Sequence, residues 1–512
     1  MPLLRLASKA NGEVNEKQIP SIKNPTSRQK RRRAQSTHMP IHGSIARRIG
    51  LTARSAVLTT VACSILAGAY AWTNEVNSTG NRFLLLDSRI VSDTKNAKMT
   101  LGTVKKSEAN PLFGEDKPWE KRFDNFYGNI IFDTEDGLYK CWYSPFIVDL
   151  SAKGMTLEDR KKPYVPPKDR QMAICYAVSK DGIHWEKPNL DLVDYEGSKK
   201  NNIIWRWPHG AGIFKDTLET NSDRRYKVIY WGLNVSASKD GLNWAHPLKL
   251  EDVKVAGDTH NNAFWAPTLN QYVAITRTWD KGIRQVARIE SKDFVHWSPA
   301  EVVLQGTTTN LQPYAMTAFY YGGVYLGLVA IHEQPPVDRV WVELAWSPDT
   351  KEWHRVAEGS PFIPLSETPL AYDYGCIYAC ANPVFLKNEI RLYYGGSDYS
   401  HGGWRNGSLC LATLRPDGFA GYEPVSKDES AIVTTSVFDY PGPDIQISAD
   451  VAKGGSIVAN VVDGEGNVIS KASPIAETVT DGPLKFQEPL KPGKFRLRFE
   501  IKDARLYSFS FR

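Results

Sequence analysis

The chain has 512 residues, of which 42% are hydrophobic and 23% charged, a composition that is ordinary for a soluble globular protein of about two domains. The formal net charge is +6, but residues 1–71 hold 12 Lys or Arg against 2 Asp or Glu, so the other 441 residues carry a net charge of −4. A mildly acidic remainder lacks the electrostatic footprint of a nucleic-acid-binding protein, and we expect no nucleic-acid partner.

The basic N-terminal block precedes an apolar run, as in an export signal. Residues 47–54 hold three arginines, and the run 56–72 ends in two sites of the Ala-x-Ala type. We therefore expect cleavage near Trp72 and a periplasmic or secreted protein. A retained membrane anchor is the alternative, because the run is near the lower length limit for crossing a bilayer. Met39 is a second possible start, in which case residues 1–38 would not be translated.

Residues 72–118 form a connecting segment between the signal and the repeats described next. One strand is predicted from Phe83 to Val91. Its apolar run from Leu84 to Leu86 could pair with the C-terminal residues or close a ring of sheets.

A short pattern with an Asp-centred turn and a tryptophan occurs four times after this segment. The copies are Ser179 to Trp185, Ser238 to Trp244, Ser291 to Trp297 and Ser347 to Trp353. A unit of 50 to 60 residues with one such turn indicates the four-stranded blades of a β-propeller. The Asp-Gly pairs in the first two copies predict type I′ hairpins on outer strands. Because an indole buries a large apolar area, we expect the tryptophans to pack between blades.

Counting the repeats gives five blades within residues 119–425, because a degenerate fifth copy runs from Leu414 to Phe419. The strands between the turns alternate and are rich in aromatic residues, as in Tyr226 to Trp231. The blades are expected near residues 120–195, 200–250, 255–305, 310–365 and 370–425. The predicted fold class is therefore all-β.

Five blades with the pattern Ser-x-Asp-Gly-x-x-Trp resemble the five-bladed propeller glycoside hydrolases, the group containing families 32, 43, 68, 117 and 130. Further stretches look like a bacterial branch often labelled family 32-like: Asn110-Pro-Leu, Pro118-Trp-Glu, Asp124-Asn-Phe-Tyr, Tyr139-Lys-Cys-Trp-Tyr, Asp258-Thr, Phe264-Trp, Tyr272-Val, Tyr372-Asp-Tyr-Gly and Tyr393-Tyr-Gly-Gly. The Asn-Asp-Pro-Asn-Gly and Arg-Asp-Pro signatures of invertases are missing, so fructoside hydrolysis does not follow. The resemblance covers residues 81–425 and implies a glycoside hydrolase with a carbohydrate substrate.

Residues 426–512 differ in composition from the repeats. They contain no tryptophan and no cysteine, yet they still alternate, as in Ser456 to Val462 and Leu506 to Phe511. We expect a C-terminal β-sandwich that supports the propeller.

The cysteines beyond the export signal are five, an odd number without metal or redox spacing, so at least one thiol is unpaired. Cys141 and Cys175 lie in apolar strand patterns and are expected to be small buried side chains.

Cleavage of a glycosidic bond needs a carboxylate base or nucleophile and an acid that protonates the leaving oxygen. Asp124, Asp258 and Asp373 precede innermost strands of blades one, three and five, so we expect them to converge in one central funnel. Each could instead cap a strand end. Asp124 is the expected base of an inverting, exo-acting enzyme. The general acid is expected at His332, which the resemblance to family 117 suggests, or at Glu333, and either could be a surface loop residue.

Other polar and aromatic residues near the blade entrances are candidates for binding sugar hydroxyls, although a single histidine is more often a structural residue. They are Asn125, Tyr127, His209, His260, Asn261, Arg277, Tyr378 and His401. No ligand spacing calls for a metal or a cofactor.

Three alternatives remain open. A catalytically silent carbohydrate-binding propeller would have a funnel without convergent carboxylates. A sialidase-like enzyme would use a related Asp box and an arginine triad, which is not evident in the sequence. A phosphorolytic enzyme would need a basic phosphate pocket, which the sequence does not identify. A membrane contact is expected only if the signal is retained as an anchor.

Overall fold

The computed structural model describes residues 81–512 except 124 and 443. The predicted export signal and Asp124 lie outside these residues. The described part is almost entirely β-structure, which confirms the all-β prediction. Its helical elements are α1 (Leu157–Arg160), η2 (Ser88–Ile90) and η3 (Ser222–Arg224). Within these residues no helix is long and apolar enough to cross a membrane.

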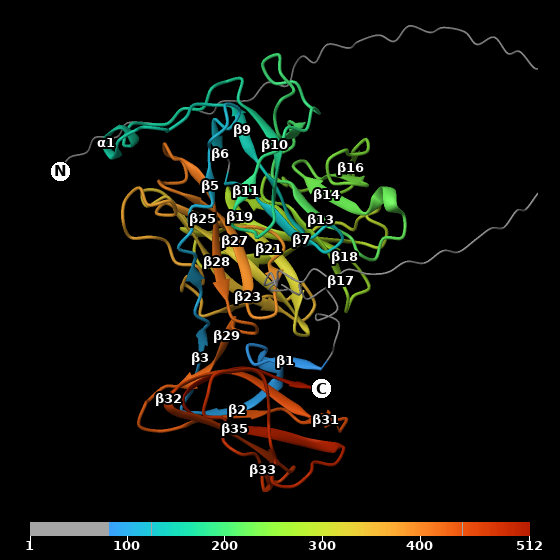
Figure 1. Cartoon of the computed structure of the whole chain (residues 1–512), viewed down its shortest axis with the longest axis vertical. Coiled ribbons are helices and arrows are strands. Elements are labelled where there is room, and N and C mark those ends of the chain that lie inside the picture. Colours follow the sequence, from blue (N-terminus) through green and yellow to red (C-terminus); the bar gives the residue numbers. More distant parts are fainter. Residues whose placement is uncertain (1–80, 124, 443) are drawn as a thin grey trace, which may run out of the picture. The chain divides into compact units, whose positions relative to one another are not determined.

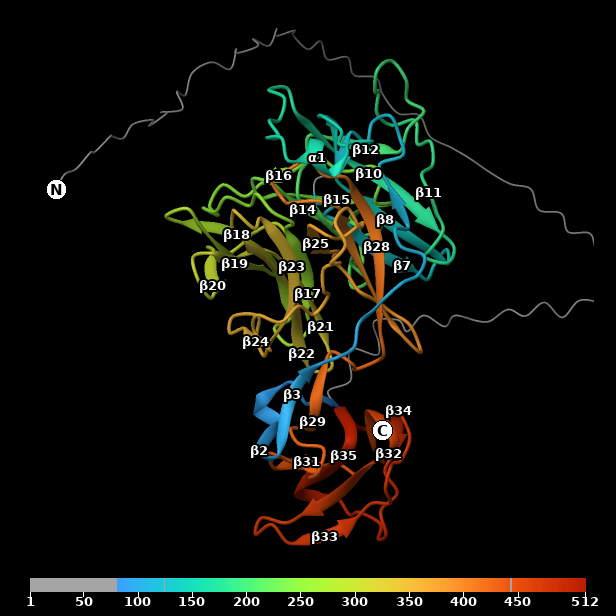
Figure 2. The same ribbon diagram turned by 90° about the vertical axis from the view of Figure 1, so that its left-hand side faces the viewer.

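Successive antiparallel sheets follow one another along the chain, in the order expected for a propeller-type fold (Figure 1, Figure 2). The first sheet contains β6 (Arg122–Phe123), β7 (Asn129–Asp133), β8 (Leu138–Tyr143), β9 (Pro145–Val148), β10 (Gln171–Ser179), β11 (Trp185–Glu186) and β12 (Ile203–Arg206). The second contains β13 (Gly212–Lys215), β14 (Tyr226–Tyr230), β15 (Asn234–Ser238) and β16 (Leu248–Lys249). The third contains β17 (Asn262–Ala266), β18 (Gln271–Asp280), β19 (Ile283–Ser291) and β20 (Glu301–Gln305).

The next sheet has ten strands and consists of two antiparallel groups. The first group is β21 (Leu311–Tyr321), β22 (Val324–Glu333), β23 (Arg339–Ser347) and β24 (His354–Val356). The second is β25 (Cys376–Ala379), β26 (Val384–Phe385), β27 (Ile390–Ser397) and β28 (Gly407–Leu414), with β4 (Lys105–Lys106) and β5 (Phe113–Gly114) paired to β28. A single parallel register pair, Val340 with Cys376, joins the two groups.

The sequence analysis expects the degenerate fifth repeat, Leu414 to Phe419, to complete the fifth blade. In the structure β4 and β5, from the N-terminal side of the chain, pair with β28 and complete this group of strands. That repeat leads instead into β29 (Ala420–Pro424), which pairs with β3 (Ala97–Leu101). The last group of strands is therefore completed from the other end of the chain, which removes an exposed edge from β28.

The repeated turns have the same local structure in all four copies. In the first, the Ser179 hydroxyl accepts the Gly182 N–H at 2.9 Å, and Asp181 Oδ1 accepts the N–H groups of Ile183 and His184 at 2.8 Å each. The prediction of a type I′ turn is wrong, because only the position of Gly182 has a positive φ, +75°. The Ser and Asp side chains satisfy the turn backbone instead.

The tryptophans of these turns pack between sheets, as predicted. Trp185 contacts Phe113 and Tyr393, whose strands belong to the last group. Trp244 joins the apolar cluster that the first and second sheets share. The buried turn is also bonded to the neighbouring sheet, because Trp142 Nε1 donates to the Gly241 carbonyl at 2.7 Å.

The C-terminal strands share one ten-stranded sheet with the first strands of the described chain. It contains β1 (Arg82–Leu84), β2 (Val91–Lys95), β3, β29, β30 (Ala431–Thr435), β31 (Phe438–Tyr440), β32 (Ile445–Val462), β33 (Val468–Lys471), β34 (Val479–Pro483) and β35 (Gly493–Phe511). The long strands β32 and β35 form its centre, and β1 pairs with β35. Of the two roles considered for the run that begins at Leu84, the structure has the pairing with C-terminal residues.

All five cysteines of the described residues are free and buried, which agrees with the expectation for Cys141 and Cys175. Burial raises the pKa of both thiols well above the usual value, so they behave as small apolar groups.

Candidate functional site

Polar and aromatic side chains from several sheets meet at the starts of strands and in the loops beside them. We call this group the axial cluster. Its members are Asn125, Tyr127, His209, Asp258, His260, Arg277, Arg284, Tyr314, His332, Asp338, Tyr378, His401 and Arg405. It gathers nine of the residues predicted from sequence, and these come from segments that are far apart in the chain.

The segment before β7 enters the axial cluster in a strained conformation. Asn125, Phe126 and Tyr127 have positive φ values of 53°, 62° and 42°. Consecutive left-handed residues other than glycine are costly, roughly 1–2 kcal/mol each, and such strain is concentrated at functional sites. The Asn125 amide helps to hold this conformation, since its Nδ2 donates to the hydroxyls of Tyr127 and Tyr314 at 2.9 and 3.1 Å. Its Oδ1 accepts from Arg405 at 2.7 Å.

Tyr314, in β21, lies at the centre of the axial cluster. Its ring centroid is 5.4 Å from that of Tyr378 and 4.7 Å from that of His401. The guanidinium carbons of Arg277 and Arg284 lie 4.4 and 5.2 Å from the same ring. Cation–π contacts in a site that is partly shielded from water help to fix both guanidinium groups.

His332 is bonded at both ring nitrogens. Its Nε2 lies 2.9 Å from Asp338 Oδ1, and Gln334 Nε2 donates to its Nδ1 at 2.9 Å. Burial lowers the pKa of His332, which favours the neutral ring. Asp338 Oδ2 accepts the Gly402 N–H at 2.7 Å. Although burial opposes ionisation of Asp338, its bonds from His332 and Gly402 hold the pKa of this carboxyl below the usual value.

Asp258 is the more exposed of the two carboxylates, with 36% of its side chain accessible. Trp279 Nε1 donates to its Oδ1 at 3.2 Å, and Arg277 Nη1 lies 3.4 Å from its Oδ2. Arg277 also donates to the Asp258 carbonyl, at 3.0 Å, which fixes the backbone on which this carboxylate lies.

The other buried histidines are neutral. Burial lowers the pKa of His260 to about 3. Burial lowers the pKa of His401 as well, and Arg405 and His332 add charge repulsion. Its Nδ1 lies 2.7 Å from the Tyr378 hydroxyl. These rings can therefore donate or accept hydrogen bonds without adding positive charge.

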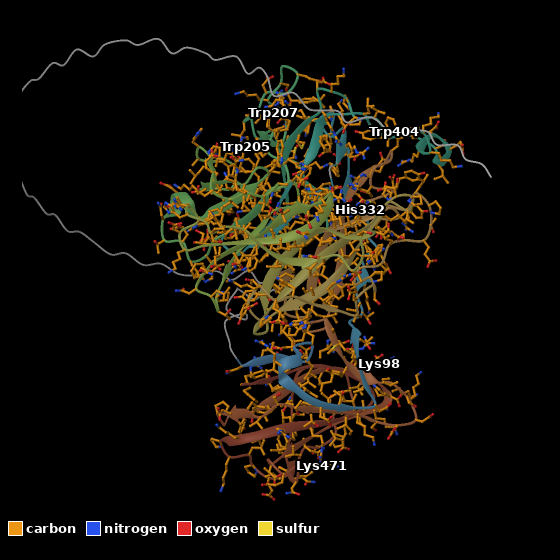
Figure 3. The ribbon with its side chains drawn as sticks, turned by 180° about the vertical axis from the view of Figure 1, so that it is seen from behind. Lys98, Trp205, Trp207, His332, Trp404 and Lys471 are labelled. Atoms are coloured by element: carbon orange, nitrogen blue, oxygen red, sulfur yellow. The ribbon has the colours of Figure 1, made fainter. Side chains whose placement is uncertain are left out.

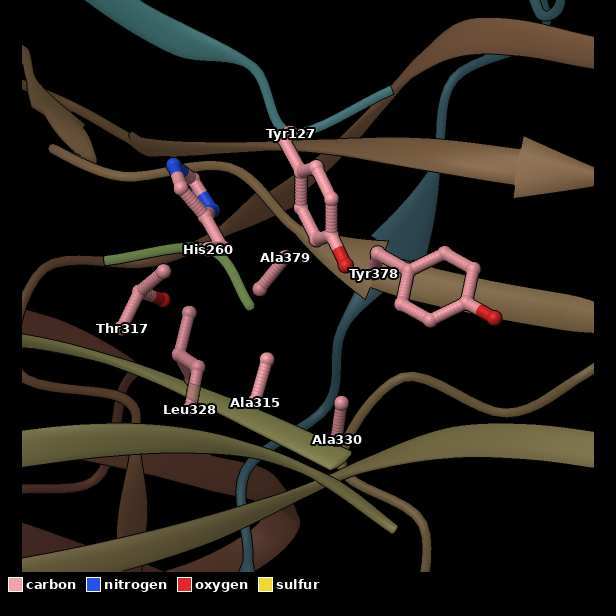
Figure 4. A pocket seen from close by; sticks show the side chains of 8 residues that line it. All are labelled: Tyr127, His260, Ala315, Thr317, Leu328, Ala330, Tyr378 and Ala379. Carbon is pink, nitrogen blue, oxygen red and sulfur yellow. The ribbon is translucent and has the colours of Figure 1, made fainter. Parts of the chain in front are cut away.

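A small cavity lies beside Tyr127, His260 and Tyr378, and it is lined also by Ala315, Thr317, Leu328, Ala330 and Ala379 (Figure 4). Its volume of ≈ 10 Å³ is about the space of one water molecule. A sugar does not fit in this cavity.

Three predicted residues are not among the members of the axial cluster. Asp373 is completely buried and pairs with Lys106 at 2.6 Å, so the predicted convergence of Asp258 and Asp373 is wrong. Asn261 is buried, and its Nδ2 donates to three backbone carbonyls, which is a structural role. Glu333 ends β22, opposite Arg339, with no side-chain hydrogen bond or ion pair recorded within the described part of the chain.

Comparisons with known proteins give similarity in structure only. No family model and no curated protein matches the chain. A β-1,2-mannobiose phosphorylase from Listeria innocua is 14% identical, with a TM-score of 0.43, and the alignment covers 61% of this chain and 97% of that one. A putative glycoside hydrolase from Parabacteroides distasonis is 14% identical, with a TM-score of 0.42 and coverages of 62% and 97%. An N-acetylgalactosamine deacetylase from F. plautii is 12% identical, with a TM-score of 0.39 and coverages of 61% and 95%. Each TM-score is below 0.5, so we base no functional argument on these similarities.

Sequence reasoning missed Arg284, Asp338 and Arg405 as members of the axial cluster. Asp338 has a positive φ of 53° in the turn after β22, and Arg405 lies in the loop between β27 and β28. Asp338 precedes β23 and Arg405 precedes β28, and neither strand is the first of its group, whereas the sequence analysis expects site residues before the first strand of each blade. Arg284 lies near the start of β19, the second strand of the long hairpin that β18 and β19 form. The length of this hairpin is the feature that could have indicated Arg284 as a candidate. Trp207, which lies two residues before His209 in the sequence, is 63% exposed (Figure 3).

In the part of the chain that the structure describes, no group of three or more His, Cys, Asp or Glu side chains is arranged to hold a metal ion.

Proposed function

We propose that the protein is an exported, exo-acting glycoside hydrolase with an inverting mechanism, built on a five-bladed propeller with a C-terminal β-sandwich. The observation that carries this proposal is the meeting of two carboxylates, Asp258 and Asp338, with hydroxyl, imidazole and guanidinium groups in the axial cluster. Sugar binding uses such convergent polar and aromatic groups, and cleavage of a glycosidic bond uses a pair of carboxyl groups.

Asp124 is the proposed base. Both residues beside it are held firmly: the Phe123 N–H donates to Glu115 Oε1 at 2.6 Å, and Asn125 is bonded to Tyr127, Tyr314 and Arg405. A base between two such residues in the sequence would be limited in its position by them. An inverting pair should be about 6.5–9.5 Å apart, which leaves room for a water molecule.

Asp258 is the proposed general acid. Asp338 is less suited to this role because its side chain is less exposed, 16% against 36% for Asp258, and both of its oxygens accept hydrogen bonds, from His332 and Gly402. His332 is also less suited, since both of its ring nitrogens are bonded and its pKa is lowered. Asp338 and His332 therefore fit a structural role, because Asp338 connects His332 to the backbone of Gly402.

A long loop supports exo action. Residues 149–170, which carry α1, extend from β9 and β10 (Figure 1). Arg160 Nη1 donates to Asp398 at 2.6 Å, and the Tyr164 ring packs against Trp404 at 5.1 Å. This loop therefore packs on the loop that carries His401 and Arg405. A cluster that is covered on one side suits the end of a glycan chain better than its middle.

A leaving-group series tests the assignments. Aryl glycosides with acidic phenols need little protonation, whereas alkyl glycosides need an acid. We expect Asp258→Asn to reduce kcat on alkyl glycosides by about 10²–10⁴-fold and on nitrophenyl glycosides by much less. Asp124→Asn should abolish both activities while the fold remains.

A matched control is Asp439→Asn, which changes an exposed carboxylate in β31. If no glycoside in a broad panel is cleaved but sugars still bind, the chain is a silent carbohydrate-binding propeller and the proposal is wrong. If Asp258→Asn lowers kcat equally on alkyl glycosides and on nitrophenyl glycosides, Asp258 is not the general acid.

A further inference from the structure

We infer that the axial cluster recognises a sugar with an anionic substituent, a carboxylate or a sulfate, through the edge of the Arg284 guanidinium group that makes no hydrogen bond to the described residues. This inference rests on the proposed function, because it specifies the substrate class of the same site.

Arg284 lacks a counter-ion within the described residues. No carboxylate lies within 4.0 Å of it there, whereas Arg277 pairs with Asp258. Among the described residues, its Nε is shielded from solvent without a hydrogen-bond partner, and its Nη2 makes no hydrogen bond. A shielded donor without a partner is rare in native proteins and indicates a group that is absent from the structure.

The orientation of Arg284 is fixed by its other contacts. Gln312 Oε1 accepts from its Nη1 at 3.1 Å and from its backbone N–H at 3.3 Å. Gln334 Oε1 lies 3.5 Å from the same Nη1, and the amide of Gln334 is the group that bonds His332. The Nε and Nη2 edge therefore makes no hydrogen bond to the described residues. Two parallel donors on one edge match a carboxylate or a sulfate, which accepts two bonds at once.

The electrostatics of the site also favour an anion. Burial and the nearby Arg277 lower the pKa of Arg284, so an added negative charge would relieve repulsion. The histidines cannot supply that charge, because they are neutral or cationic. The carboxylate of Asp258 is already paired with Arg277.

A neighbouring aromatic ring points to a sugar rather than to a free anion. The Arg284 guanidinium carbon lies 4.6 Å from the ring centroid of Trp279, which is 38% exposed. An exposed indole beside an oxyanion receptor can contact the apolar face of a sugar ring while the guanidinium binds its charged substituent. Free phosphate would use the guanidinium alone.

Binding measurements on the full chain test this without requiring turnover. Calorimetry would compare D-glucuronate, D-galacturonate and glucose 6-sulfate with D-glucose and D-galactose, and inorganic phosphate would be a separate arm. We expect at least one charged sugar to bind about tenfold to a hundredfold more tightly than its neutral parent. Arg284→Gln should reduce that preference to less than about twofold.

Two variants serve as controls. Arg284→Lys keeps the positive charge but loses the two-donor edge, so it should retain only part of the preference for charged sugars. This variant tests the inference even if Arg284→Gln folds poorly. Arg225→Gln removes an exposed arginine that pairs with Glu135, and it should bind like the wild type.

Equal affinity for charged and neutral sugars would overturn the inference, as would a preference that persists in Arg284→Gln. Phosphate binding as tightly as the sugar acids would overturn it too, since the anion would then be inorganic. The inference would also be overturned if no probe bound with a Kd below about 10 mM. If neutral glycosides are cleaved and a charged substituent makes no difference, the proposed hydrolase stands and only the inference about Arg284 fails. If charged sugars bind through Arg284 but no glycoside is cleaved, only the proposed hydrolase activity is refuted.

Discussion

Glu115 fixes the backbone on both sides of the axial cluster with one carboxylate oxygen. Its Oε1 accepts the Phe123 N–H at 2.6 Å and the Gly407 N–H at 2.9 Å. Phe123 precedes the strained segment that begins at Asn125, and Gly407 follows Arg405 by two residues. Burial raises the pKa of Glu115 to about 7.

This raised pKa predicts a pH dependence of stability. The folded protein binds a proton at Glu115 more tightly than the unfolded chain, whose ordinary value is 4.5. The free energy of unfolding should therefore fall as the pH rises from about 4.5 to about 7, by on the order of 1–3 kcal/mol. Glu115→Gln keeps an acceptor oxygen for both bonds and should flatten this slope in denaturant titrations at several pH values. The exposed Glu465→Gln should leave the slope unchanged, and an unaltered slope in Glu115→Gln would contradict the assignment.

At the scale of elements, the repeated turn is a structural lock between sheets. The carbonyls of Gly182 and Gly241 accept bonds from Tyr393 and Trp142, which belong to neighbouring groups of strands. Phe294 and Thr350 occupy the position of this glycine in the other two turns, with positive φ values of 62° and 69°. The repeat therefore requires its Ser and Asp side chains more strictly than its glycine.

Substitution of two glycines separates backbone strain from close packing. Gly241 has φ +76°, and an added Cβ would lie 2.6 Å from Trp142. Gly137 has φ +70° with no atom within 4 Å of an added Cβ. We expect Gly137→Ala to cost about 1 kcal/mol and Gly241→Ala about 1–3 kcal/mol more, as measured by chemical denaturation. If both substitutions lower the free energy of unfolding by the same amount, the two sheets can move apart at this turn without an energetic cost.

At the scale of the whole molecule, the chain closes its last group of strands with residues from its N-terminal side. Lys106 of β4 pairs with the buried Asp373, which also accepts from Ser366 and from the Tyr394 hydroxyl at 2.9 Å. This ion pair fixes a strand that is held by few backbone bonds. These contacts support a structural role for Asp373, so we expect it to contribute to stability rather than to catalysis.

Asp373→Asn should therefore lower the free energy of unfolding by about 3 kcal/mol, because it leaves a lysine without its partner. The kcat/KM of the folded fraction should stay near that of the wild type. Asp439→Asn, in an exposed pair with Lys494 at 3.8 Å, should change stability by less than about 0.5 kcal/mol. A collapse of activity in a folded Asp373→Asn protein would restore the catalytic role predicted from sequence.

The fold class and the turns could be predicted from the sequence because they depend on neighbouring residues. Alternation with period two, and a serine two residues before an aspartate, act over a few positions of the chain. The packing of Trp185 and Trp244 follows from the same spacing. The closure of the last group could not be predicted this way, since the pairing of β4 with β28 joins residues about 300 positions apart.

Part of the axial cluster was predictable from residues that precede the first strand of a group, as Tyr127 precedes β7 and His260 precedes β17. Asp258 and Asp373 have similar positions in the sequence, yet one contacts Arg277 and the other contacts Lys106. The sequence by itself determined an all-β repeat and the residue types available for chemistry. Only the tertiary structure decided which of them meet, because a side chain's partners depend on the direction from which distant strands approach it.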